Sequence, residues 1–97
     1  MNGPLLRGVL YGHGHMGQLH AAKLTARTDV GIVIVDPQRG MQPSLPGTVD
    51  FAVIATPTHT HGAVALPWLE QGVPCLIEKP LSNSLHEAEH LAQFPNS

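Results

Sequence analysis

Gly12, Gly14 and Gly17 form the spacing G-x-G-x-x-G directly between an apolar segment and a segment of helical periodicity. In a dinucleotide site the first such glycine permits a tight turn, the second lets the backbone approach a pyrophosphate, and the third lets helix and strand pack closely. The phosphates then meet free N–H groups at the positive end of the helix. We therefore expect Gly12, Gly14, His15, Met16 and Gly17 to contact a dinucleotide. The alternative is a tight strand-to-helix turn with no ligand.

Asp36 stands nineteen residues after Gly17, at the end of a β-branched run. A dinucleotide fold needs a carboxylate about 20 residues past its glycine loop to hold the adenosine ribose hydroxyls. The alternative is an Asp-Pro turn, because Pro37 follows. An acid repels a 2′-phosphate, so Asp36 favours NAD over NADP as the cofactor. Arg39 is near enough in sequence to weaken that preference.

Two further polar segments follow apolar runs. In ATPTHTH, Thr56 and Pro57 begin an exposed turn before a helix N-terminus, and His59 and His61 could reach a bound nicotinamide ribose. A pair of solvated histidines near a helix start is the simpler alternative.

The second such segment is Glu78, Lys79 and Pro80, directly after VPCLI. Neither charge could be buried within a strand, so we expect both at the mouth of a crevice. A lysine there can donate a hydrogen bond to a substrate hydroxyl and stabilise negative charge as a proton leaves. The alternative is a surface ion pair that contributes little.

Apolar segments alternate with segments of helical periodicity, and residues 37–48 form a loop rich in proline and glycine. The expected strands are 5–11, 30–35, 49–55 and 73–77, and the expected helices are 16–26, 61–71 and 84–94. This order predicts an α/β fold, a Rossmann-like three-layer sandwich with helices on both faces of a small, mainly parallel sheet of about four strands. The run 30–35 is typical of a strand covered on both faces. Every motif falls at the carboxyl end of an expected strand, where such sheets bind ligands.

The 97 residues are enough for one domain, residues 1–97, but not for two. Charged residues make up 12% of the chain, about half the usual share of roughly 25%. We therefore expect part of the surface to be covered by a further domain or by a partner subunit, as in a homo-oligomer. The net charge of −2, without a basic run, argues against a nucleic-acid partner.

The sequence also indicates in which cellular compartment the protein is expected. No apolar stretch is long enough to span a membrane, and the first residues lack the apolar core of a signal peptide. Cys75 is the only cysteine, so it cannot form an internal disulfide, and we interpret it as a small buried hydrophobe. These features predict a cytoplasmic protein with no membrane partner.

Together the motifs resemble the Gfo/Idh/MocA oxidoreductases, in that family's order and over nearly the whole chain. The matching elements are G-x-G-x-x-G-x-x-H from Gly12 to His20, Asp36, T-P-x-x-x-H from Thr56 to His61, and E-K-P from Glu78 to Pro80. The E-K-P element is the most specific, because ordinary dinucleotide folds lack it.

The resemblance implies NAD(P) bound at the glycine loop, and hydride transfer between the nicotinamide and a hydroxyl-bearing carbon of a sugar, polyol or related compound. It makes Thr56, Pro57, His61 and Glu78 expected cofactor contacts. Lys79 matches the family's active-site lysine, which helps polarise the substrate hydroxyl. A cis peptide before Pro80 is a further expectation.

The sequence departs from the family in two places. Family members carry a large C-terminal domain that supplies most substrate contacts, whereas this sequence stops at Ser97. We therefore expect cofactor binding rather than catalysis, with a small-molecule substrate bound only if a second domain or chain is supplied. Only twelve residues separate Asp36 from Val49, which predicts an irregular crossover, a smaller sheet and a less enclosed adenine side.

Residues 86–90 read HEAEH and match the zinc-peptidase motif H-E-x-x-H. Helical geometry places Leu85, Ala88, Leu91 and Ala92 on one apolar face, which turns both histidines of the motif toward solvent. Glu87 is expected in a capping box with the serine three residues before it. No third ligand follows the second histidine, so we predict no metal site.

A further alternative is a non-catalytic nucleotide-binding or interaction module. The sparse surface charge supports it, and the sequence alone does not separate it from part of an enzyme.

Overall fold

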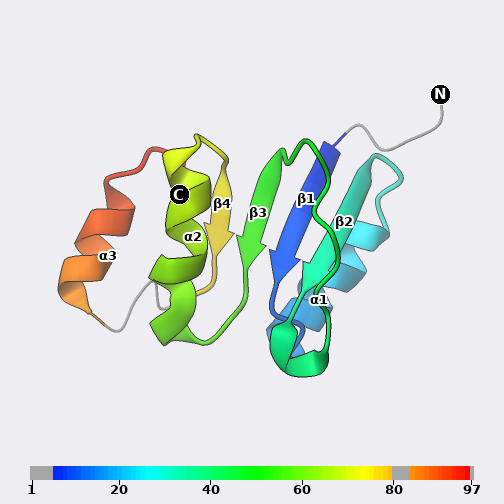
Figure 1. Ribbon diagram of the computed structural model, residues 1–97, viewed down its shortest axis with the longest axis horizontal. Helices are drawn as coiled ribbons and strands as arrows, with labels where there is room; N and C mark the ends of the chain where they lie inside the picture. Colours follow the sequence, from blue (N-terminus) through cyan, green and yellow to red (C-terminus); the bar gives the residue numbers. More distant parts are fainter. Residues whose placement is uncertain (1–5, 80–83, 97) are drawn as a thin grey trace.

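The computed structural model describes residues 6–79 and 84–96. These residues form four strands and three α-helices, and an α-helix follows every strand except the second (Figure 1). The strands are β1 (Leu6–Tyr11), β2 (Val30–Val35), β3 (Phe51–Ile54) and β4 (Cys75–Ile77). The helices are α1 (His15–Thr25), α2 (His61–Glu70) and α3 (Leu85–Ala92), with short 3-10 helices η1 (Pro37–Arg39) and η2 (Thr58–Thr60).

The strands form one parallel sheet in the order β2-β1-β3-β4. Leu10 lies opposite Ile34 on one side and Val53 on the other, so β1 is fully paired at its carboxyl end. The chain leaves β1 toward one neighbour and later returns to the other. Parallel sheets open a ligand crevice at such a reversal, here at the carboxyl ends of β1 and β3. The predicted four-stranded parallel sheet is confirmed.

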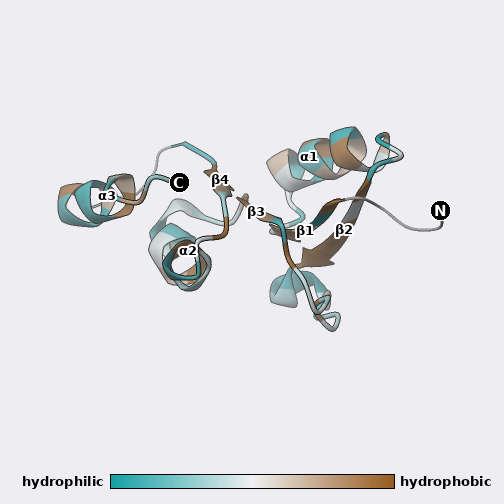
Figure 2. Ribbon diagram, turned by 90° about the horizontal axis from the view of Figure 1, so that it is seen from above, coloured by the Kyte–Doolittle hydropathy of each residue, from teal (hydrophilic) through white to brown (hydrophobic). Residues whose placement is uncertain are grey.

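The helices cover opposite faces of the sheet, which makes three layers (Figure 2). Side chains alternate along β3 between these faces. Val53 packs with Leu10 and with Ala21 of α1, whereas Ala52 and Ile54 pack with α2. The predicted Rossmann-like sandwich is therefore confirmed.

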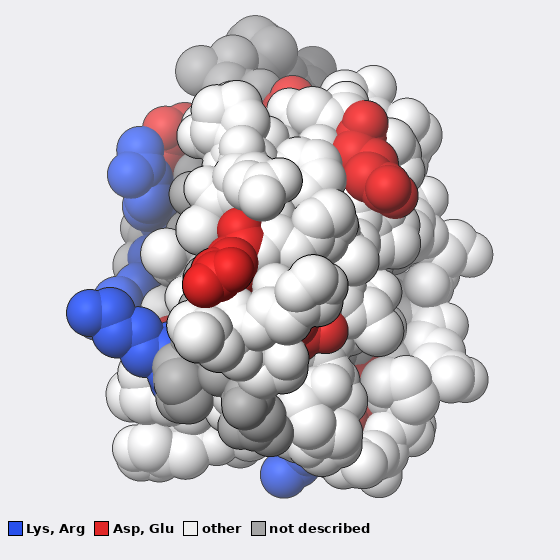
Figure 3. All heavy atoms as spheres, turned by 90° about the vertical axis from the view of Figure 1, so that its left-hand side faces the viewer, with Lys and Arg blue, Asp and Glu red and all other residues white. Residues whose placement is uncertain are grey.

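Helix α3 begins as its sequence predicts, because the Ser84 hydroxyl accepts a hydrogen bond from the Glu87 N–H at 3.3 Å. Fewer of its apolar residues are buried than the sequence predicts. Leu91 is fully buried in the cluster under α2, but Leu85 is 77% exposed and Ala92 is exposed as well. The expected apolar face therefore contacts the protein chiefly through Leu91. Viewed from the side on which α3 lies, the molecule shows separate acidic groups on a mostly uncharged surface, with basic groups at the edges of the view (Figure 3).

Strands β3 and β4 begin two residues later than expected. Before β4, the Val73 N–H bonds to the Trp68 carbonyl and so closes the end of α2. Pro74 then has no N–H to offer a neighbouring strand. Cys75 is buried within β4, and burial raises the pKa of its thiol to about 11.

The prediction that β2 is covered on both faces is wrong. All six of its residues are only half-buried, because β2 is an edge strand. One face packs against α1. The other is flanked by η1 and by the connection from η1 to β3 rather than by an α-helix (Figures 1 and 2). Within the described residues, no helix is long and apolar enough to cross a membrane.

The packing of α3 can be tested with two leucines of the same helix. Leu91→Ala should lower the free energy of unfolding by about 2–5 kcal/mol, because it leaves a cavity in the core. Leu85→Ala, at an exposed position, should change it by less than about 0.5 kcal/mol. Urea unfolding followed by circular dichroism measures both, and equal effects would contradict the packing described above.

Candidate functional site

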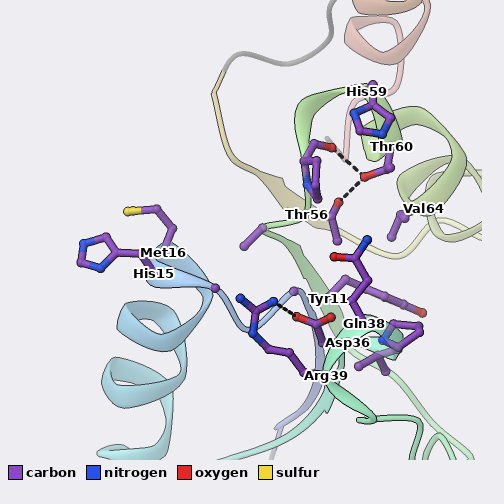
Figure 4. Close-up of a pocket in the computed structure, with 16 residues that line it drawn as sticks. Tyr11, His15, Met16, Asp36, Gln38, Arg39, Thr56, His59, Thr60 and Val64 are labelled. Carbon is purple, nitrogen blue, oxygen red and sulfur yellow. Dashed lines mark hydrogen bonds and ion pairs between the residues drawn. The ribbon is translucent and has the colours of Figure 1, made fainter.

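A cavity of about 880 Å³ opens at the carboxyl ends of β1, β2 and β3 (Figure 4). Its walls come from the turn before α1, from η1, and from the segment that joins β3 to α2. The lining residues are Tyr11, Gly12, Gly14, His15, Met16, Val35, Asp36, Pro37, Gln38, Arg39, Ala55, Thr56, Pro57, His59, Thr60 and Val64.

Two glycines fix how closely the loop approaches the sheet. Gly12 has a φ of +96°, and a Cβ there would lie 2.5 Å from the Ala55 carbonyl oxygen. A Cβ on Gly17 would overlap the Gly12 carbonyl oxygen. Because glycine has no side chain at either position, helix α1 can start directly against the carboxyl ends of β1 and β3.

The start of α1 is open to an anion. Its N-cap residue, Gly14, provides no side-chain cap, and the first turn contains no acidic residue. A Cβ on Gly14 would meet nothing closer than Arg39 Nη2, at 3.9 Å. The N–H groups of a helix's first turn lack partners within the helix and carry partial positive charge. This end of the cavity therefore suits a phosphate or pyrophosphate group.

Asp36 forms the adjoining wall and is only 7% exposed. Its Oδ2 accepts hydrogen bonds from the His13 N–H at 2.8 Å and from Arg39 Nη1 at 3.0 Å. These two groups, the His13 N–H above all, hold the pKa of Asp36 below its usual value against the opposing effect of burial. The cavity therefore contains an ionised carboxylate bonded directly to the glycine loop.

The turn after β3 is held by hydrogen bonds of its own. The Thr60 hydroxyl lies 2.7 Å from the Thr56 hydroxyl and 2.6 Å from the Pro57 carbonyl. His61 is 1% exposed, and its Nε2 lies 2.9 Å from the Thr56 carbonyl oxygen. Because a carbonyl only accepts, Nε2 carries the proton. His61 thus supports the turn from beneath and lies outside the cavity lining, whereas His59 is part of it.

Glu78 and Lys79 lie at the end of β4. The Glu78 N–H continues the sheet by bonding to the Ile54 carbonyl at 3.0 Å, and its carboxylate pairs with Nε2 of His20 on α1. Lys79 is exposed. Gly17, Glu78 and Lys79 do not line the cavity. Pro80, with its expected cis peptide, lies outside the described residues.

The structure thus brings most of the expected cofactor contacts to one cavity. These are Gly12, Gly14, His15, Met16, Asp36, Thr56 and Pro57. The lining also contains Tyr11, Gln38 and Val64, which the sequence motifs do not predict. Of these three residues, only Tyr11 could have been found from the sequence. It comes immediately before the glycine loop, so it ends the central strand, where the cavity opens.

The HEAEH segment lies on α3, away from this cavity. Both of its histidines are exposed, and the ring of His90 packs edge-on against Phe94. Within residues 6–79 and 84–96, no three histidine, cysteine or acidic side chains are placed to hold a metal ion. The zinc-peptidase hypothesis therefore gains no support from the described part of the chain.

A parallel sheet with a helix start that is open to an anion and an ionised acid at the next strand end defines a dinucleotide-binding Rossmann-type domain. The profile of an oxidoreductase family with an NAD-binding Rossmann fold, GFO_IDH_MocA, matches residues 35–96. The chain belongs to this Gfo/Idh/MocA family.

Two curated relatives are similar over most of the chain. UDP-N-acetylglucosamine 3-dehydrogenase of Acidithiobacillus ferrooxidans is 36% identical over 100 residues, which cover 89% of this chain and 32% of the relative. Inositol 2-dehydrogenase of Mycolicibacterium gilvum is 31% identical over 108 residues, with coverage of 91% and 31%. The chain therefore spans about a third of the length of these relatives.

A solved structure is similar in fold as well as in sequence. GenD2 from gentamicin A biosynthesis, determined in complex with NAD, superposes with a TM-score of 0.73 at 31% identity. The match covers 93% of this chain and 31% of GenD2.

The ionised state of Asp36 gives the folded protein a specific acid sensitivity. Because its pKa is lowered from 3.8, the charged carboxylate stabilises the fold above about pH 4, and this contribution is lost as the pH falls through the lower folded value. Asp36→Asn should therefore be less stable than wild type near neutral pH. The difference should shrink below about pH 4.

Urea unfolding at a series of pH values between about 3 and 7 measures this difference. A difference that stays constant over the whole range would contradict the pairing of the Asp36 carboxylate with His13 and Arg39.

Proposed function

We propose that this chain is the NAD-binding part of an oxidoreductase that transfers hydride to or from a hydroxyl-bearing carbon of a sugar, polyol or related compound. One observation carries the proposal: the uncapped start of α1 and the ionised Asp36 face the same cavity. Family membership and the names of the two dehydrogenase relatives support the reaction class.

The cavity fits the parts of a dinucleotide in order. The first turn of α1 would hold the pyrophosphate, since Gly14 leaves the backbone open there. Asp36 would accept hydrogen bonds from the adenosine ribose hydroxyls. Thr56, Pro57 and His59 would border the remaining half, which carries the nicotinamide. When bound, NAD supplies the carbon that takes up or gives the hydride.

We assign the substrate-facing role to Lys79. Its neighbour Glu78 is tied to His20 and to the Ile54 carbonyl, so the backbone before Lys79 is fixed at the end of β4. A cationic ammonium there can donate a hydrogen bond to a substrate hydroxyl and stabilise the negative charge that develops as its proton leaves. The acceptor of that proton and most substrate contacts would come from a second domain or chain.

The choice between NAD and NADP depends on two side chains at the end of β2. A buried carboxylate repels a 2′-phosphate, whereas a guanidinium attracts one. Here Arg39 is already paired with Asp36, so its charge is partly neutralised. This pairing supports NAD as the preferred cofactor.

Titration calorimetry with NADH tests the proposal directly. We expect wild-type chain to bind NADH and Asp36→Ala to bind it at least about tenfold more weakly, because hydrogen bonds to a charged group are lost. Asp29→Ala serves as the matched control, since Asp29 is a partly exposed acid that pairs with Arg27 before β2 and does not line the cavity. No heat with wild type at millimolar NADH, or equal affinities for the two variants, would overturn the proposal.

The cofactor preference gives a separate test. Wild type should bind NADH about five- to tenfold more tightly than NADPH, given roughly 1 kcal/mol for a close charge repulsion in a wet cavity. Asp36→Ala should narrow this ratio, and Arg39→Gln should widen it. An Arg39→Gln protein that favours NADPH would refute the assigned roles.

A further inference from the structure

Tyr11 lines the cavity, yet the assignments above give it no role. It is the last residue of β1, and its half-buried ring packs with the core cluster on the α2 side of the sheet. In Figure 4 the side chain extends away from His15 and Met16. Gln38 of η1 and Val64 of α2 belong to the same part of the lining.

The Tyr11 hydroxyl is held in place by Trp68. The indole Nε1–H donates a hydrogen bond to the Tyr11 oxygen at 3.0 Å, and the two rings are tilted by 53° with centroids 6.4 Å apart. An indole N–H can only donate, so the hydroxyl keeps its own proton for a second partner. Among the described residues, no group accepts that proton. Burial also raises the pKa of Tyr11, so the hydroxyl remains a donor at physiological pH.

The place of this donor matches one part of an adenosine nucleotide. With phosphate at the start of α1 and ribose at Asp36, the base is the next group outward. The side chains of Gln38 and Tyr11 lie on the side of Asp36 away from His15 and Met16, which mark the start of α1 (Figure 4). Pro37 and Val64 supply apolar surface there, and the Gln38 amide and the Tyr11 hydroxyl supply polar atoms.

We infer that the Tyr11 hydroxyl donates a hydrogen bond to a ring nitrogen of adenine, and that Trp68 positions the hydroxyl for this contact. Adenine N1, N3 and N7 are acceptors of the kind that a fixed phenol can recognise. The inference rests on the proposed function and deepens it, since it makes Tyr11 a determinant of specificity for the base.

ADP is the probe, because it carries the base, the ribose and the phosphates without nicotinamide. Tyr11→Phe keeps the ring and removes only the hydroxyl. We expect it to weaken ADP binding to the 97-residue chain about fivefold in titration calorimetry, the effect of one neutral hydrogen bond. Inorganic pyrophosphate, which lacks the base, should bind wild type and Tyr11→Phe equally.

Deaza analogues of ADP test the contact without changing the protein. One of 1-deaza-, 3-deaza- and 7-deaza-ADP should bind wild type about fivefold more weakly than ADP, and Tyr11→Phe should not distinguish that analogue from ADP. Trp68→Phe, which releases the hydroxyl, should fall between wild type and Tyr11→Phe in ADP affinity.

The outcomes separate the two proposals. If wild type binds neither ADP nor NADH, the proposed function fails. If wild type binds ADP but treats all three analogues alike, or Tyr11→Phe binds ADP as wild type does, the role of Tyr11 is overturned while the proposed function stands. An equal loss of pyrophosphate binding in Tyr11→Phe would also overturn it, because the effect would then concern the whole cavity rather than the base.

Discussion

The rest of the site depends on the close approach between the glycine loop and the sheet. Gly12 sits against the Ala55 carbonyl, and Gly17 sits against Gly12, with no space for a side chain at either point. This contact brings the first turn of α1 to the crevice between β1 and β3. Because the His13 N–H then reaches the Asp36 carboxylate, the loop also fixes the acid that forms the next wall. The lack of side chains at these two glycines thus determines where the first turn of α1 and the Asp36 carboxylate lie.

Much of the fold could be predicted because it follows from periodicity. The alternation of apolar and helical segments gave the order of elements, and the β-branched run 30–35 matched β2 residue for residue. The predictions that were wrong concern which residues are buried. Sequence cannot show that β2 is an edge strand, since its apolar residues resemble those of a central strand. Likewise the apolar positions of α3 could not reveal that only Leu91 reaches the core.

In the candidate site, the sequence predicted the positions of the backbone better than the directions of the side chains. Motif spacing located strand ends, and the glycines and Asp36 lie at the cavity because their backbone positions are set there. Spacing says nothing of where a side chain turns after the strand. His61 turns inward beneath its own turn, while Glu78 reaches across to His20. The Tyr11–Trp68 bond joins residues far apart in sequence, so no local pattern could disclose it.

The buried thiol of Cys75 has a practical consequence. Reagents that alkylate or exchange with thiols attack the thiolate, and burial keeps both the reagent and the ionised form away from this sulfur. Modification must therefore wait for β4 to separate from its neighbours. The rate of thiol labelling under native conditions would then report the opening of this short edge strand, beside the residues that precede Lys79. Because Cys75 is the only cysteine in the sequence, its labelling would report local unfolding at this one site.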